Sequence, residues 1–139
     1  MREVVFLGAA DWVQASRQRV IEAFQGLVAA LALDGSIVTA HDPFFVSRFA
    51  AKRYFQLLTR AKYELRLSLP YSGGSLSVGS FNIHEDFFGR SFGIRMSDDR
   101  FAATGCVGIG LERWVWALFA QHGLDIARWP EGARRVLRL

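Results

Sequence analysis

Two segments of the chain carry apolar residues at the spacing of an amphipathic helix. In residues 12–33 and 111–122 the apolar positions recur at intervals of three and four. Asp11 is predicted to cap the first helix, because a short acidic side chain directly before such a pattern can accept a hydrogen bond from the first turn. Gly35 is predicted to end the same helix in the left-handed conformation.

Alternating and short apolar runs predict a set of strands. The clearest is 63–69, where three leucines fall on one face and Glu64, Arg66 and Ser68 fall on the other. This strand is expected to be exposed on one side. The other predicted strands cover residues 3–7, 36–40, 75–84, 92–96 and 101–107.

The order of the elements favours a sheet that is largely antiparallel. Residues 42–45 read as a turn, 47–60 as a further helix, and Pro130 suits the first turn of a short basic helix at the C-terminus. A run of strands flanked by helices indicates an α+β fold, here expected as a single domain over residues 1–139.

The composition excludes several classes of protein for this chain. The chain has 139 residues, a hydrophobic fraction of 51%, a formal charge of +4 and one cysteine. A single cysteine excludes an internal disulfide framework and an all-cysteine metal site within one chain. No targeting segment stands out, and the longest uncharged apolar run, 24–33, is about half of the ~20 residues that a membrane span needs. We therefore expect a soluble cytoplasmic protein that does not interact with membranes.

One glycine-rich segment, 105–114, has a pattern that suits a nucleotide. Gly108 and Gly110 would let a flat ligand lie close to the backbone, and Arg113 falls in the first turn of the following helix. A guanidinium there can bind phosphates through a planar, charged fork. The pattern alone is equally compatible with a strand-to-helix turn that carries a surface arginine.

A second polar segment lies in the predicted strand 75–84. Ser80, Asn82 and His84 share one face of it, which is either solvated or lines a pocket. Asn82 offers both a donor and an acceptor, as an amino-acid substrate requires. Cys106, the lone cysteine, is more typical of a small core residue than of a nucleophile; His84 is its one plausible histidine partner.

Taken in order, these segments resemble a known family. The segment 108–113 is similar to motif 3 of the class II aminoacyl-tRNA synthetases, and 1–8 to the closing strand of motif 2 in the atypical, zinc-dependent seryl-tRNA synthetases. The full series is most similar to the amino acid:carrier protein ligases, small homologues of that catalytic core. The matching segments are 1–8, 42–45, 80–84, 87–89, 106–113, 122–125 and 129–130.

The resemblance implies a reaction and its residues. Such enzymes form an aminoacyl adenylate from an amino acid and ATP with magnesium, then pass the aminoacyl group to the phosphopantetheine thiol of an acyl or peptidyl carrier protein. By this resemblance Arg113 is the catalytic residue that clamps the ATP phosphates, while Gly108 and Gly110 form the floor under the adenine. Glu3 and Cys106 match two ligands of a zinc ion that holds the substrate amino group. Asn82 and Ser80, with Cys106, match the substrate-binding positions, for which glycine or alanine is the family's usual amino acid.

The resemblance also leaves parts of the family pattern unmatched. A third zinc ligand, the phosphate-binding arginine of motif 2 and the dimer-forming motif 1 have no counterpart in the chain. The matched region is therefore the C-terminal half of such a ligase, from the end of motif 2 through motif 3, and the isolated chain is expected to be weakly active or inactive. Truncation, a split enzyme and a reduced homologue would all account for this.

The possible partners follow from these alternatives. We expect a homodimer or a complementing N-terminal polypeptide, and no tRNA. Two other readings stay open: a non-catalytic paralogue that binds a carrier protein or a nucleotide, and a seryl-tRNA synthetase remnant.

Overall fold

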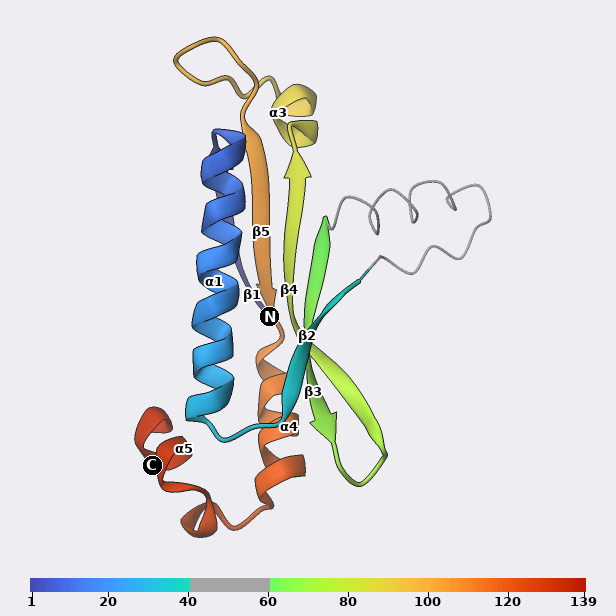
Figure 1. Cartoon of the computed structure of the whole chain (residues 1–139), viewed down its shortest axis with the longest axis vertical. Helices are drawn as coiled ribbons and strands as arrows, with labels where there is room; N and C mark the ends of the chain where they lie inside the picture. Colours follow the sequence, from blue (N-terminus) through green and yellow to red (C-terminus); the bar gives the residue numbers. More distant parts are fainter. Residues whose placement is uncertain (41–60) are drawn as a thin grey trace, which may run out of the picture.

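The protein folds around one antiparallel five-stranded sheet with the strand order β1-β5-β4-β3-β2 (Figure 1). The computed structural model describes residues 1–40 and 61–139. The strands are β1 (Arg2–Gly8), β2 (Gly35–Thr39), β3 (Lys62–Leu69), β4 (Gly74–Glu85) and β5 (Ala103–Ile109). The helices are α1 (Ala10–Ala30), α3 (Phe87–Phe92), α4 (Leu111–His122) and α5 (Glu131–Leu137), and a 3-10 turn covers Ile126–Arg128.

The predicted α+β fold with an antiparallel sheet is confirmed. Every neighbouring pair of strands in the sheet runs antiparallel. The helix predicted at 111–122 has those bounds, and the alternation in 63–69 places Leu65 and Leu67 in the core. The predicted turn 42–45 and helix 47–60 lie outside the described residues.

Three local predictions were wrong. Asp11 lies inside α1, whose N-cap is Ala9, because the helix begins two residues earlier than the apolar pattern suggests. Gly35 opens β2; α1 ends at Ala30 with Leu31 as its C-cap, and it is Ala32 that adopts the left-handed conformation, with φ 52°. The strand predicted at 92–96 does not form: Phe92 is the last residue of α3, and within 93–96 only Arg95 forms a bridge, with Phe101.

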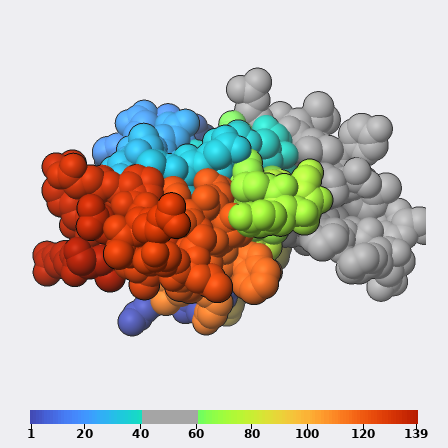
Figure 2. Space-filling model, turned by 90° about the horizontal axis from the view of Figure 1, so that it is seen from below, coloured from blue at the N-terminus to red at the C-terminus, as the bar shows by residue number. Residues whose placement is uncertain are grey.

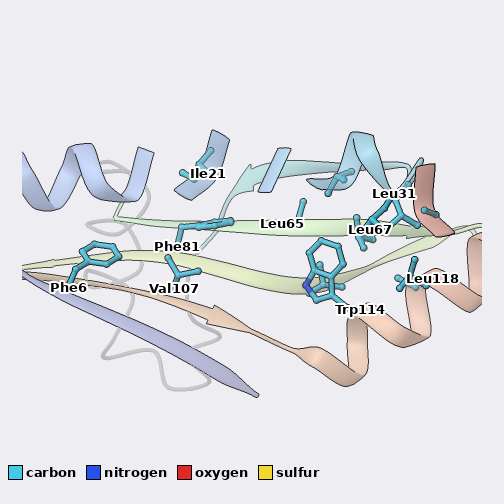
Figure 3. Close-up of a cluster of buried hydrophobic side chains, with 14 of the residues drawn as sticks. Phe6, Ile21, Leu31, Leu65, Leu67, Phe81, Val107, Trp114 and Leu118 are labelled. Atoms are coloured by element: carbon cyan, nitrogen blue, oxygen red, sulfur yellow. The ribbon is translucent and has the colours of Figure 1, made fainter. Parts of the chain in front are cut away.

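The core lies between the sheet and the helices α1 and α4. Phe81 of β4 meets Phe24 of α1 edge to face, with 5.6 Å between the ring centroids, and Trp114 of α4 lies 6.0 Å from the same Phe24. Figure 3 shows Phe81 close to Val107 in this layer, with Trp114 further along the sheet. Seen from below in Figure 2, α4 and α5 cover one end of the molecule, beside the end of α1 and the β3–β4 turn. None of the helices within the described ranges is long and apolar enough to cross a membrane.

Two helical glycines provide a matched test of this packing. A Cβ at Gly89 of α3 would overlap the carbonyl oxygen of Ala102, whereas a Cβ at Gly26 of α1 would meet nothing within 4 Å. Gly89→Ala is expected to lower the free energy of unfolding by about 1–3 kcal/mol, because the backbone it strikes cannot give way. Gly26→Ala is expected to raise it by about 0.5–1 kcal/mol, because glycine weakens a helix interior. Urea unfolding followed by circular dichroism measures both; equal effects would contradict this account of α3.

Candidate functional site

The residues singled out from the sequence gather on one face of the sheet, opposite the core. Phe6, Phe81 and Val107 point into the core, so the alternate residues of β1, β4 and β5 point the other way. The register sets Asn82 opposite Cys106, and Gly108 between Ser80 and Glu3. This polar face therefore holds side chains from positions 3, 80, 82 and 106 on three adjacent strands.

Cys106 is the centre of a hydrogen-bonded group on this face. It is 7% exposed, and its sulfur accepts a hydrogen bond from Asn82 Nδ2 at 3.3 Å. The same Nδ2 donates to Ser80 Oγ at 3.3 Å. His84 Nε2 lies 3.7 Å from the sulfur, and His84 Nδ1 lies 3.2 Å from the hydroxyl of Thr104. The predicted sharing of one face by Ser80, Asn82 and His84 is confirmed.

The surroundings of Cys106 shift two pKa values. Burial raises the pKa of the Cys106 thiol; the hydrogen bond from Asn82 opposes the rise and the nearby Glu3 carboxylate adds to it. Burial also lowers the pKa of His84, against the pull of Glu3. The ground state at neutral pH is therefore a thiol beside a neutral imidazole, which a cation can convert into a thiolate ligand.

The glycines at the end of β5 have different roles in the structure. A Cβ at Gly108 would lie 3.1 Å from Ser80 Oγ, so the glycine keeps the polar face open between Ser80 and Glu3. Gly110 is the N-cap of α4, and a Cβ there would lie 3.2 Å from Cδ of Arg113. Gly110 thus gives room to the arginine stem.

Arg113 reaches back from the first turn of α4 to the edge of this face. Its Nη1 donates to the carbonyl oxygen of Ser77 on β4 at 2.9 Å. That contact uses one of the five N–H donors of the guanidinium and fixes its plane at the end of the sheet. The side chain is exposed, so the remaining donors can meet an anion from solvent.

Sequence reasoning missed two charged residues on this face. Lys62 lies opposite Asn82, and Glu64 lies opposite Ser80. The Glu64 carboxylate is 3.7 Å from Lys62 Nζ and 3.2 Å from Arg66 Nη1, and the Lys62 and Glu64 side chains are less than one-fifth exposed. The alternation in 63–69 already put Glu64 and Arg66 on the polar side, but the pairing of β3 with β4 was needed to bring them to Ser80.

Glu3 and Cys106 face the same side of the sheet, and carboxylate and thiolate are both zinc ligands. In the part of the chain that the structure describes, however, no three His, Cys, Asp or Glu side chains are grouped so as to hold one metal ion. The two implied ligands alone do not complete a zinc site.

Comparison with known proteins identifies relatives along the whole chain, although no protein-family model matches it. Amino acid–acyl-carrier-protein ligases 1 and 2 of Bradyrhizobium diazoefficiens are 34% and 39% identical, over 100% of this chain and 43% and 42% of their own lengths. The type-2 serine–tRNA ligase of Methanopyrus kandleri is 33% identical over 93% of the chain and 26% of the ligase.

Solved structures agree with these relatives. The M. kandleri seryl-tRNA synthetase, crystallised with a tRNASec of A. aeolicus, superposes with a TM-score of 0.81 and 32% identity over 96% of this chain and 27% of its own. The Pyrococcus horikoshii seryl-tRNA synthetase, complexed with ATP, shares the fold with a TM-score of 0.72 at 18% identity. The chain spans less than half of each of these relatives.

Proposed function

We propose that this chain contributes to an ATP-dependent ligase that activates a small amino acid. The chain is homologous to part of the type-2 serine–tRNA ligases and of the amino acid–acyl-carrier-protein ligases, and it has the fold of class II aminoacyl-tRNA synthetases. The observation that carries the proposal is the match to both carrier-protein ligases over the full chain. The polar face supports it, because Asn82 contacts Cys106 on this face and Arg113 is anchored at its edge.

The proposed reaction has two steps. The amino-acid carboxylate attacks the α-phosphorus of ATP, and pyrophosphate leaves with its magnesium. A phosphopantetheine thiol of the carrier protein then attacks the carbonyl carbon of the adenylate, and AMP leaves. Arg113 would pair with the phosphates, and the open backbone at Gly108 would admit the nucleotide. Such a ligase would work in the cytoplasm, where ATP is available.

The amino-acid substrate would lie over Cys106. Asn82 spans Ser80 and Cys106, so its amide can orient a ligand on either side. Glu3 and Cys106 would be among the ligands of a zinc ion. When bound, such an ion would act as a Lewis acid toward the substrate amino group.

The free edge of β1 supports a proteinaceous partner. All seven residues of β1 pair with β5, and among the described residues β1 is the last strand on that side of the sheet. Val4 and Val5, which point to opposite faces, are 54% and 65% exposed. Apolar residues on both faces are typical of an interior strand. We infer that a complementing polypeptide adds a strand here; a second copy of the chain is the alternative that a size measurement would reveal.

The test is amino-acid-dependent exchange of pyrophosphate into ATP. We expect little exchange by the chain alone, and exchange with glycine or alanine once a polypeptide carrying the remainder of the class II core is added. Transfer of labelled amino acid to a phosphopantetheinylated carrier protein, and not to tRNA, would then identify the acceptor. Transfer to tRNASer would favour the seryl-tRNA synthetase remnant. Absence of exchange in every mixture would contradict the ligase and leave a non-catalytic paralogue.

A further inference from the structure

We propose that Lys62 of β3 is a nucleotide-binding residue whose ammonium group binds the α-phosphate, between the nucleotide and the amino acid. The inference rests on the proposed function, which puts the nucleotide at Gly108 and the amino acid over Cys106, on the same face of β5. The α-phosphorus is the atom at which these two parts of the adenylate are joined. A cation held between the two positions would therefore meet the α-phosphate.

The strand register places Lys62 on the polar face. Lys62 lies opposite Asn82 of β4, and Asn82 lies opposite Cys106 of β5, so the three residues form one row across the sheet. The next row on this face contains Glu64 and Gly108. Residues in register across a sheet present their side chains to the same side, so Lys62 belongs to the row of the amino acid and Glu64 to the row of the nucleotide.

The contact between Lys62 and Glu64 determines where the ammonium group lies along the sheet. Lys62 Nζ is 3.7 Å from Glu64 Oε1, so the lysine side chain leans from its own row toward the row of Gly108. The two side chains are only 16% and 19% exposed, which keeps both of them against the sheet. Burial raises the pKa of the Cys106 thiol, and the positive charge of Lys62 is among the effects that oppose this rise. The ammonium group is thus close to both rows.

The charges around Glu64 favour an anion at this point. The Glu64 carboxylate lies between Lys62 and Arg66, whose Nη1 is 3.2 Å away. Arg66 is anchored in turn, because its Nε donates to Ser75 Oγ and its Nη2 to the carbonyl oxygen of Ser75, both at 3.0 Å. Two cations around one carboxylate carry a net positive charge, and a partly buried charge attracts an anion more strongly than one in water.

Arg113 continues the positive charge toward the end of the sheet. Its Nη1 donates to the carbonyl oxygen of Ser77, the residue that lies opposite Arg66. The two guanidinium groups are therefore anchored on β4 two residues apart, at Ser75 and Ser77. Beyond them, toward Cys106, comes the ammonium group of Lys62. This order matches a nucleotide whose outer phosphates meet Arg113 and whose α-phosphate meets Lys62.

Isothermal titration calorimetry of the intact chain with AMP and with adenosine tests the proposal. AMP carries the α-phosphate alone, and adenosine carries no phosphate. Lys62→Met removes the charge but keeps a long side chain, and it is expected to weaken AMP binding about tenfold or more, because a hydrogen bond between charged groups is lost. Adenosine binding is expected to stay unchanged. A purely structural role of Lys62 would instead change the affinity for both ligands equally.

Two further variants complete the experiment. Lys62→Arg keeps the positive charge and is expected to retain most of the affinity for AMP. Arg100→Gln, the matched control, removes an exposed arginine that pairs with Asp98 and should leave AMP binding unchanged. Lys62→Gln replaces Lys62→Met if circular dichroism shows that the methionine variant does not fold.

Three results would overturn the proposal: equal AMP binding by wild type and Lys62→Met, an equal loss of affinity for adenosine, or no binding of AMP by the wild type. The experiment measures binding and does not depend on turnover. AMP binding that requires Lys62, in a chain that shows no pyrophosphate exchange in any mixture, would therefore refute the ligase alone and leave the α-phosphate site in place.

Discussion

Arg113→Ala is expected to weaken the binding of ATP with magnesium about 10- to 140-fold. A hydrogen bond to a charged group contributes about 1.5–3 kcal/mol, and each 1.4 kcal/mol changes a dissociation constant tenfold. Arg113 is placed for such bonds because one N–H anchors it to the Ser77 carbonyl and its stem lies over Gly110. The guanidinium is therefore held in place before the nucleotide arrives.

Isothermal titration calorimetry of the chain with ATP measures this effect. Arg113→Lys keeps the charge but loses the planar fork, so we expect an intermediate loss. Arg135→Ala removes an exposed arginine from α5 and should leave the affinity unchanged. Equal binding by wild type and Arg113→Ala would remove Arg113 from the nucleotide site, and absence of binding by the wild type would contradict a self-sufficient ATP site.

The sequence pattern predicted best the elements in which the apolar residues repeat regularly along the whole element. The apolar spacing in 111–122 predicted both bounds of α4 correctly, and the alternation in 63–69 predicted which side of β3 is buried. In both elements the local pattern and the tertiary packing favour the same face, so no long-range information was needed.

The wrong predictions of secondary structure fall where contacts between residues distant in the sequence determine the local conformation. No helix was predicted at 87–92, where phenylalanine favours strands, yet the segment forms α3, in which Gly89 packs directly on the backbone of Ala102. The end of α1 was misjudged because Ala32, a residue with no special preference for φ > 0, takes the left-handed position instead of Gly35. Neither contact can be deduced from neighbouring residues.

In the candidate site, too, local patterns could be predicted from the sequence, whereas contacts between distant residues could not. Alternation alone predicted that Ser80, Asn82 and His84 share a face. The contact of Asn82 with Cys106 joins residues 24 positions apart, and that of His84 with Thr104 joins residues 20 apart, so both depend on the register of β4 with β5. Because a shift by one residue would turn Cys106 into the core, composition and spacing could name the site residues but could not bring them together.

Phe81→Ala is expected to lower the free energy of unfolding by about 3–5 kcal/mol, the usual cost of removing a buried aromatic ring. Phe81 is fully buried on β4, between Tyr63 of β3 and Val107 of β5, and meets Phe24 of α1 edge to face. The cavity would open between the sheet and α1, where three strands and a helix meet, and this region cannot collapse without moving the ladder that carries Asn82. Urea unfolding followed by tryptophan fluorescence gives the measurement.

Phe92→Ala is the matched control for this prediction. Phe92 ends α3 and is 74% exposed, so its removal should change the free energy of unfolding by no more than about 0.5 kcal/mol. If Phe81→Ala cost as little as Phe92→Ala, the layer between α1 and the sheet could not be the core. In that case the strand register that sets Asn82 beside Cys106 would lose its main physical support, because burial of Phe81 on one face is what holds Asn82 on the other.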